Sequence, residues 1–322
     1  MRSKHLIDPE LLAGLEQIPA IDFSQDLLAV IRQGIGKMVE GIPDLRDARV
    51  EERRIRSSAG HEIGILIHTP RKHAPARPAV LHIHGGGYIL GTAKMSTAAN
   101  LKKTIDADCV VASVDYRLAP ETTHPGPVED CYEALKWLHD NAASLGIDPA
   151  RIAVEGESAG AGLAAALALL ARDRGEIAII HQHLIYPMLD DRTCLAGTHP
   201  YAGEFVWTPE SNFFGWSSLL GCAPGGAGIS CYAAAARAED LSGLPSTYIA
   251  VGALDLFAQE DIEYARRLIQ AGVPTELHVY PGAYHGFDIA AGAQVSIRAQ
   301  LNSISALRRA LHTRNNAADP PS

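Results

Sequence analysis

The sequence predicts an α/β protein built on a mostly parallel β-sheet with helices on both faces. Short runs of apolar and β-branched residues alternate with longer helical segments, which is the order that repeated βαβ units give. Two of the runs, AVLHIH and CVVASV, are apolar almost throughout, as expected of strands buried on both sides. The length of 322 residues suits one large domain with a cap better than two independent domains.

The predicted elements follow these runs in chain order. Strands rich in Val, Ile and Leu are expected at residues 62–68, 79–84, 109–115, 152–155, 177–186, 247–251 and 276–280. Helices are expected at residues 127–145, 159–174, 259–271 and 296–314. Gly272 and Pro274 follow the third helix, where a glycine just past the end and a proline soon after it are typical stop signals.

Two segments lie outside this alternation and are predicted to form a cap over the sheet. Residues 1–45 have the pattern of helices ahead of the first strand, and residues 190–240 are rich in Gly, Pro and aromatic residues. The α/β core would then comprise residues 46–189 and 241–314. The tail, residues 315–322 (NNAADPPS), is predicted to be disordered.

Composition and charge exclude several classes of protein. Apolar residues make up 47% of the chain and charged residues 20%, so a large core can form. A net charge of −9 argues against nucleic acid as a partner, because phosphate binding needs clustered positive charge. The five cysteines include no C-x-x-C pair, which argues against a disulfide framework or a structural zinc site.

No membrane-targeting segment is predicted. Lys4, Asp8 and Glu10 interrupt the apolar runs near the N-terminus, so no signal-peptide core is expected there. The longest apolar run, residues 161–171, is far shorter than the roughly 20 residues that span a bilayer. We therefore expect a soluble cytoplasmic protein without a membrane partner.

Residues 156–160, Gly-Glu-Ser-Ala-Gly, form a G-x-S-x-G motif between a predicted strand and a predicted helix. A serine in such a strained turn brings the chain on its two sides so close that only small side chains fit, which accounts for Gly156 and Gly160. The turn would hold the hydroxyl of Ser158 above the end of the sheet, near the positive end of the helix dipole. An ordinary glycine-rich turn is the alternative, but the flanking strand and helix favour a nucleophilic serine.

Three consecutive glycines follow the predicted strand 79–84, in the sequence His84-Gly85-Gly86-Gly87. Such a run costs backbone entropy, which makes sense where a substrate touches bare backbone and N–H groups point into a cavity. Gly86 and Gly87 are therefore candidate oxyanion-hole donors, with Ala159, just after the serine, as a third. A flexible phosphate-binding loop is the alternative, but the usual glycine-rich phosphate patterns are absent.

A nucleophilic serine needs a histidine as its base and an acid that holds the histidine's tautomer. Asp255 and His285 each follow a late predicted strand, at the sheet edge where α/β active sites form. The alternatives are a helix N-cap for Asp255 and a surface loop position for His285. Glu260 or Asp261 would be the next candidate for the acid.

A metal site is the alternative interpretation of His82 and His84. Alternation along a strand would place both imidazoles on one face. No convincing set of further ligands accompanies them, so we expect no metal and no organic cofactor.

These motifs together resemble a known family. HGGG (84–87), DYRLAPE (115–121), GESAG (156–160), a late Asp and HGF (285–287) are similar to the hormone-sensitive-lipase-like carboxylesterases of the α/β-hydrolase fold, closest to bacterial short-chain esterases of the heroin-esterase kind. The resemblance covers about residues 45–312 and implies roles for six residues: Ser158 as nucleophile, His285 as base, Asp255 as its orienter, and Gly86, Gly87 and Ala159 as oxyanion donors.

The resemblance implies a serine carboxylesterase that hydrolyses small-molecule esters with short acyl chains. Five aromatic residues are candidates for its substrate pocket, although the cap members could equally pack a core of their own: Tyr88, Phe205, Trp207, Phe213 and Phe214. Within DYRLAPE we expect Arg117 to pair with Glu121. Three departures from the family pattern are Ala161 after S-A-G, Leu256 after the acid, and Tyr88 after HGGG.

Other functions and assemblies remain open at this point. The same residues would serve an amidase or thioesterase, and a non-catalytic ligand receptor can share the fold. Such receptors usually lose a member of the triad, whereas all three candidates are present here. The strand at 276–280 would lie at a sheet edge, where it could pair two copies into a homodimer.

Overall fold

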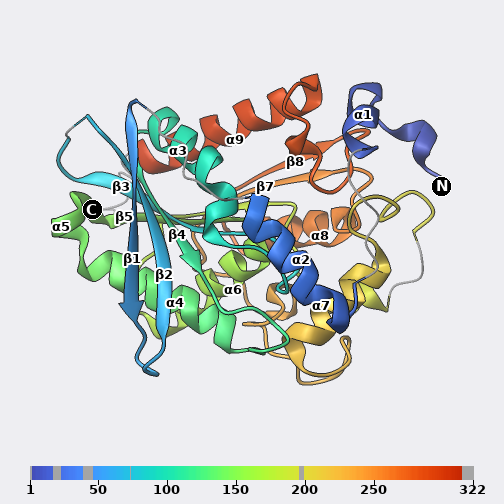
Figure 1. Cartoon of the computed structure of the whole chain (residues 1–322), viewed down its shortest axis with the longest axis horizontal. Helices are drawn as coiled ribbons and strands as arrows, with labels where there is room; N and C mark the ends of the chain where they lie inside the picture. Colours follow the sequence, from blue (N-terminus) through green and yellow to red (C-terminus); the bar gives the residue numbers. More distant parts are fainter. Residues whose placement is uncertain (1, 17–22, 39–45, 73, 196–198, 314–322) are drawn as a thin grey trace.

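The computed structural model describes residues 2–16, 23–38, 46–72, 74–195 and 199–313. They form an eight-stranded sheet with the strand order β1-β2-β4-β3-β5-β6-β7-β8 (Figure 1). The strands are β1 Ala48–Arg56, β2 Glu62–Pro70, β3 Arg77–Ile83, β4 Val110–Asp115, β5 Ile147–Glu157, β6 His181–Ile185, β7 Ser246–Gly252 and β8 Thr275–Tyr280. Only the β1–β2 and β2–β4 pairs are antiparallel, which confirms the predicted α/β class with a mostly parallel sheet.

Helices cover both faces of this sheet. They are α1 Leu12–Leu15, α2 Gln25–Met38, α3 Thr97–Asp106, α4 Gly126–Asp140, α5 Ala142–Leu145, α6 Ala159–Arg174, α7 Pro209–Leu220, α8 Ala258–Gln270 and α9 Gln294–His312. In Figure 1, α3 and α9 lie on one side of the sheet and α4 and α6 on the other. Each face is thereby closed from water by its own apolar cluster.

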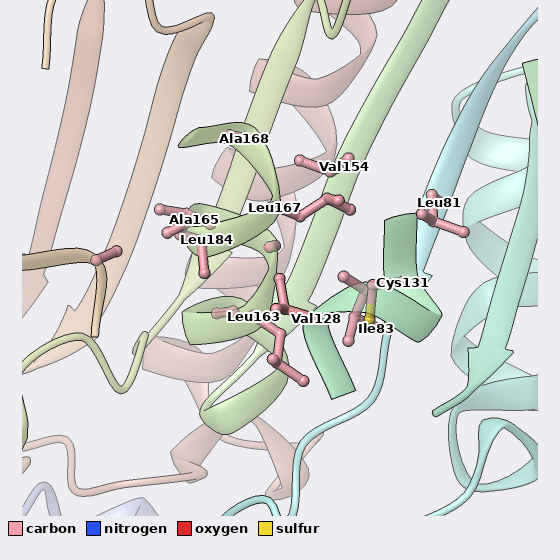
Figure 2. Close-up of a cluster of buried hydrophobic side chains, with 14 of the residues drawn as sticks. Leu81, Ile83, Val128, Cys131, Val154, Leu163, Ala165, Leu167, Ala168 and Leu184 are labelled. Atoms are coloured by element: carbon pink, nitrogen blue, oxygen red, sulfur yellow. The ribbon is translucent and has the colours of Figure 1, made fainter. Parts of the chain in front are cut away.

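Helix α6 is the centre of the larger cluster. Every residue from Ala159 to Ala171 is buried, which explains why this helix is rich in Ala and Leu on all sides. Figure 2 shows its Leu163 and Leu167 among side chains of β5, β6 and α4. Truncating one such leucine to alanine would lower the free energy of unfolding by about 2–5 kcal/mol. Packing against the sheet therefore holds the helix that follows Ser158 in place.

Several predicted boundaries were wrong. The helix expected at 127–145 is divided into α4 and α5, because the side chain of Asn141 donates to Trp137 O and ends α4. The strand expected at 177–186 begins only at His181, where pairing with β5 starts. Strand β1 and helices α3 and α7 were not predicted, whereas α6 was predicted to the residue.

The expected ion pair between Arg117 and Glu121 was also wrong. Arg117 donates from its main chain and its guanidinium to Asp130 of α4, at 2.8–2.9 Å. Glu121 accepts instead from Arg32 of α2. The DYRLAPE segment is therefore held by two helices rather than by its own charges.

The proposed domain limits stay predictions. The described part of the N-terminal segment contains α1 and α2, and the segment 190–240 contains α7. The tail 315–322 lies outside the described residues. Strand β8 lies at one edge of the sheet, and the homodimer predicted through it also stays a prediction. In the part of the chain that the structure describes, no helix has the length and apolar character to cross a bilayer.

Candidate active site

Ser158 occupies a sharp turn between β5 and α6. Its backbone has φ 56° and ψ −122°, a strained conformation for a residue with a side chain. A Cβ on Gly156 would lie 2.4 Å from the carbonyl carbon of Gly160, and one on Gly160 would lie 2.1 Å from Ile83 O. The two glycines are therefore required by backbone contact, as the motif predicts.

The structure brings the three candidate triad residues together. Nε2 of His285 lies 2.9 Å from Ser158 Oγ, and its Nδ1 lies 2.8 Å from Asp255 Oδ2. All three side chains are buried. Ser158 follows β5, Asp255 follows β7 and His285 follows β8. An ionised Asp255 accepts a hydrogen bond from Nδ1–H, which leaves the Nε2 lone pair to accept from the serine hydroxyl.

Asp255 has a second contact that fixes its carboxylate. Its Oδ1 accepts a hydrogen bond from Phe257 N at 3.0 Å, in the turn before α8. Helix α8 begins at Ala258 with Phe257 as its N-cap residue, so the N-cap alternative for Asp255 was wrong. The bond from Phe257 N instead holds the carboxylate in place beside His285.

Glu260 and Asp261, the other candidates for the acid, do not contact His285. Glu260 accepts from Leu189 N, Asp190 N and the Thr193 hydroxyl, and burial raises the pKa of its carboxyl to about 8. Burial likewise raises the pKa of Asp261, whose carboxylate has no hydrogen-bond partner among the described residues. Of the three carboxylates, Asp255 is the one that contacts the histidine.

The glycine loop, residues 84–90, lies directly beside this serine. A Cβ on Gly85 would lie 2.8 Å from Glu157 O and 3.4 Å from Ser158 Cβ. Gly86 has φ 122° and Gly87 has φ 60°, values that favour glycine. Among the described residues, the N–H groups of Gly86 and Gly87 have no hydrogen-bond acceptor.

Ala159 brings a third N–H group to the same place. It is the first residue of α6, and its N–H is one of the helix-terminal donors that have no partner within the helix. The three predicted oxyanion donors therefore flank the serine, and within the described ranges their N–H groups have no hydrogen-bond acceptor. The helix dipole adds positive potential at this point.

Three aromatic rings surround the imidazole of His285. The rings of Tyr186 and Phe257 meet it edge-on, with centroids at 4.7 and 5.3 Å, and the indole of Trp207 lies at 6.3 Å. Tyr186 also donates to Asp288 Oδ1 at 2.9 Å, and burial raises the pKa of both groups. Tyr186 and Phe257 were missed from the sequence, although Tyr186 stands at the end of a predicted strand.

The five predicted pocket aromatics have different surroundings. Tyr88 is buried, donates to Met188 O and packs on Trp216, and Phe205 is buried near Tyr284. Trp207 and Phe214 both contact Phe23, which the sequence did not single out. The Phe213 side chain is 47% exposed. Trp207 is the member of this set that lies against both His285 and the glycine loop.

The two histidines of the H-x-H pattern have different neighbours. His82 bridges Ser113 Oγ and both carboxylate oxygens of Glu157. Although burial opposes it, the contact with His82 lowers the pKa of Glu157 to about 2. His84 lies past the end of β3, with Nδ1 on Gly85 O and its ring stacked on Tyr116. Within the described ranges, no three His, Cys, Asp or Glu side chains are grouped to hold a metal.

A family profile described as alpha/beta hydrolase fold matches residues 80–289, the span that contains the serine turn, the glycine loop and the Asp and His loops. The chain belongs to this family. Esterase LipI of Mycobacterium tuberculosis (strain ATCC 25618 / H37Rv) is 33% identical to it over 96% of this chain and 97% of the relative. An arylesterase of Saccharolobus solfataricus is 31% identical over 87% of this chain and 92% of the relative.

Solved structures agree with this membership. A bacterial heroin esterase superposes with a TM-score of 0.89 and 40% identity, over 96% of this chain and 99% of that chain. Esterase LipW of Mycobacterium marinum gives a TM-score of 0.84 and 33% identity, over 96% and 97%. These similarities confirm the predicted resemblance to the hormone-sensitive-lipase-like carboxylesterases.

Proposed function

We propose that this carboxylic ester hydrolase cleaves small-molecule esters with short acyl chains through a Ser158-His285-Asp255 triad. The observation that carries the proposal is the continuous hydrogen-bonded chain from Asp255 through His285 to a serine held in a strained turn. The esterase names of its relatives support the reaction class.

The proposed reaction begins with acylation. Ser158 Oγ attacks the ester carbonyl carbon while His285 Nε2 accepts the hydroxyl proton. The carbonyl oxygen becomes an oxyanion that accepts hydrogen bonds from the N–H groups of Gly86, Gly87 and Ala159. When the tetrahedral intermediate collapses, the C–O bond to the alcohol breaks and the alcohol leaves with the proton from Nε2.

Deacylation repeats the same chemistry with water. His285 Nε2 removes a proton from a water molecule that attacks the acyl-enzyme, and the second tetrahedral intermediate expels Ser158. The proton returns to Ser158 Oγ, and the carboxylic acid product leaves. No step requires a metal or an organic cofactor. Removing one oxyanion donor in such a site costs on the order of a hundredfold in rate.

Trp207 supports the preference for short acyl chains. Its side chain is 6% exposed and lies between the glycine loop and Phe23, close to the imidazole of His285. A large, rigid indole so near the serine restricts the space that an acyl chain can occupy.

The first experiment is hydrolysis of p-nitrophenyl esters from acetate to laurate by the wild type and by Ser158→Ala. We expect activity that is highest for short chains and is lost in the variant, with circular dichroism and melting temperature unchanged. Near wild-type activity in Ser158→Ala would overturn the mechanism. A folded wild type without activity on any ester would favour an amidase, a thioesterase or a receptor.

The role of Asp255 is tested separately. Asp255→Asn should lower kcat by orders of magnitude, because the amide cannot hold the imidazole tautomer as the carboxylate does. Asp261→Asn is the matched control, since this neighbouring buried carboxylate does not contact His285. Similar kcat losses in the two variants would contradict a specific role for Asp255.

A further inference from the structure

Arg32 of α2 binds main-chain and side-chain acceptors on two loops beside the site. Its Nε donates to Ile89 O at 2.8 Å and its Nη2 to Ala119 O at 2.7 Å. The carboxylate of Glu121 accepts from Nη1 at 2.7 Å and from Nη2 at 3.1 Å. All three guanidinium nitrogens are thus engaged, and the side chain is only 25% exposed.

The first of these acceptors belongs to the glycine loop. Gly86 O closes the loop by accepting from Ile89 N at 3.1 Å and Leu90 N at 2.9 Å. The carbonyl that Arg32 binds, Ile89 O, belongs to the same peptide group as Leu90 N. Movement of this carbonyl would therefore move the turn that contains Gly86 and Gly87.

The second acceptor, Ala119 O, belongs to a segment that is itself bonded to the same loop. Ala119 N donates to Tyr88 O at 2.9 Å, so the segment that follows β4 is already joined to the glycine loop. Arg32 binds the carbonyl of Ala119 as well as that of the residue after Tyr88. The guanidinium thus connects both the glycine loop and the segment after β4 to helix α2.

The residue just ahead of helix α2 makes a second contact near the site. Phe23, just ahead of the helix, stacks on Phe214 of α7 and contacts Trp207, with ring centroids at 6.5 and 5.7 Å. Figure 1 shows α2 lying next to α7. The helix that carries Arg32 is therefore attached to the glycine loop by Arg32 and, through the preceding Phe23, to the aromatic residues Trp207 and Phe214.

We propose that Arg32 is a positioning residue, which holds the glycine loop so that the N–H groups of Gly86 and Gly87 stay aimed at the oxyanion. The inference rests on the proposed esterase mechanism. Oxyanion stabilisation depends on donors that are already oriented before reaction, and a displacement of about 1 Å can cost a hundredfold in rate. Arginine suits this position because its planar fork reaches several acceptors at fixed angles, which lysine cannot do.

Glu121 has the lesser part in this arrangement. Hydrogen bonding from Arg32 lowers the pKa of its carboxyl, but the Glu121 side chain is 63% exposed. Exposed ion pairs contribute little, whereas bonds to partly buried carbonyls leave those carbonyls unpaired when the donor is removed. We therefore expect Glu121→Gln to have a much smaller effect on kcat than Arg32→Lys.

The test compares Arg32→Lys and Arg32→Ala with the wild type on p-nitrophenyl butyrate. Active sites are counted with paraoxon, so that kcat refers to reactive serines only. We expect kcat to fall about tenfold or more with KM within about twofold. The inhibition constant of phenylboronic acid, whose serine adduct places an oxygen among the oxyanion donors, should rise by a similar factor. Methylguanidinium should restore part of the kcat of Arg32→Ala.

Arg266→Ala is the matched control. Arg266 makes a bidentate pair with Glu263 on the surface of α8 and should leave every parameter unchanged when replaced. If Arg32→Lys keeps wild-type kcat per titrated site and an unchanged boronate constant, the inference is wrong even though the esterase mechanism stands. Failure of the mechanism itself would appear in the wild type and in Ser158→Ala, and is thereby separable.

Discussion

The indole of Trp207 lies against the backbone of Gly87. A Cβ placed on that glycine would stand 2.1 Å from Cη2 of the indole. The ring cannot retreat easily, because Nε1 donates to Asn212 Oδ1 at 3.2 Å and Phe23 covers the ring. The position of the indole beside His285 and the need for glycine at position 87 therefore depend on each other.

Gly87→Ala should lower kcat/KM by roughly a hundredfold or more. The new methyl group collides with Trp207, and the φ of 60° strains any residue other than glycine, so the proposed oxyanion donor is displaced. Steady-state kinetics on p-nitrophenyl acetate measures the loss. Gly226→Ala is the control, because a Cβ there meets nothing within 4 Å. A Gly87→Ala variant as active as this control would exclude the assigned contact.

Trp207→Ala should shift the preferred acyl chain toward longer esters. Removing the indole opens space beside His285 and the glycine loop, so activity on octanoate relative to acetate should rise about tenfold. The ratio of the two kcat/KM values is the readout. Phe213→Ala removes an exposed aromatic ring of the same segment and should leave the ratio as in the wild type. An unchanged ratio in Trp207→Ala would place the acyl pocket elsewhere.

Glu260→Gln should make stability less dependent on pH. Burial raises the pKa of this carboxyl from 4.5 to about 8, so the folded protein keeps a proton that the unfolded chain loses above about pH 4.5. The resulting stabilisation is present at low pH and is lost as the pH rises toward 8. Glutamine cannot ionise, and it retains an oxygen to accept from Leu189 N.

Urea unfolding at pH 5 and pH 8 measures this effect. The free energy of unfolding should fall less in Glu260→Gln than in the wild type, by about 1–3 kcal/mol. Glu263→Gln, an exposed position on the same helix, should behave much like the wild type. Equal pH dependences in the wild type and Glu260→Gln would show that the buried carboxyl does not titrate in this range.

The parts of the site that depend on backbone sterics could be predicted from the sequence. A Cβ on Gly156 or Gly160 would collide with backbone atoms, so both positions require glycine. This requirement is visible in the sequence as the G-x-S-x-G motif. The order of strands then placed Asp255 and His285 at the same sheet edge as Ser158. Local sequence pattern and strand order were therefore sufficient to predict the serine turn and the positions of Asp255 and His285.

Contacts between distant segments could not be predicted in this way. Strand β1 is rich in Arg and Glu, as suits an edge strand open to water, so it lacks the apolar signal of the buried strands. Glu121 pairs with a helix about ninety residues earlier, and nothing near it in the sequence indicates that partner. The segment of helix α7 does contain local start and stop signals: Thr208 caps it, Pro209 begins it and Gly221 follows it.

The glycine contacts divide the site into a part that tolerates change and a part that does not. A Cβ on Gly85, Gly156 or Gly160 would collide with main-chain atoms, and substituting a neighbouring side chain would not remove that collision. Gly87 differs, because its neighbour is a side chain on a separate segment. Selection for a new substrate, in nature or in the laboratory, therefore has little freedom around Ser158 and more at side chains such as Trp207 and Phe23. The chemistry is inherited as a fixed unit, whereas the substrate range can evolve.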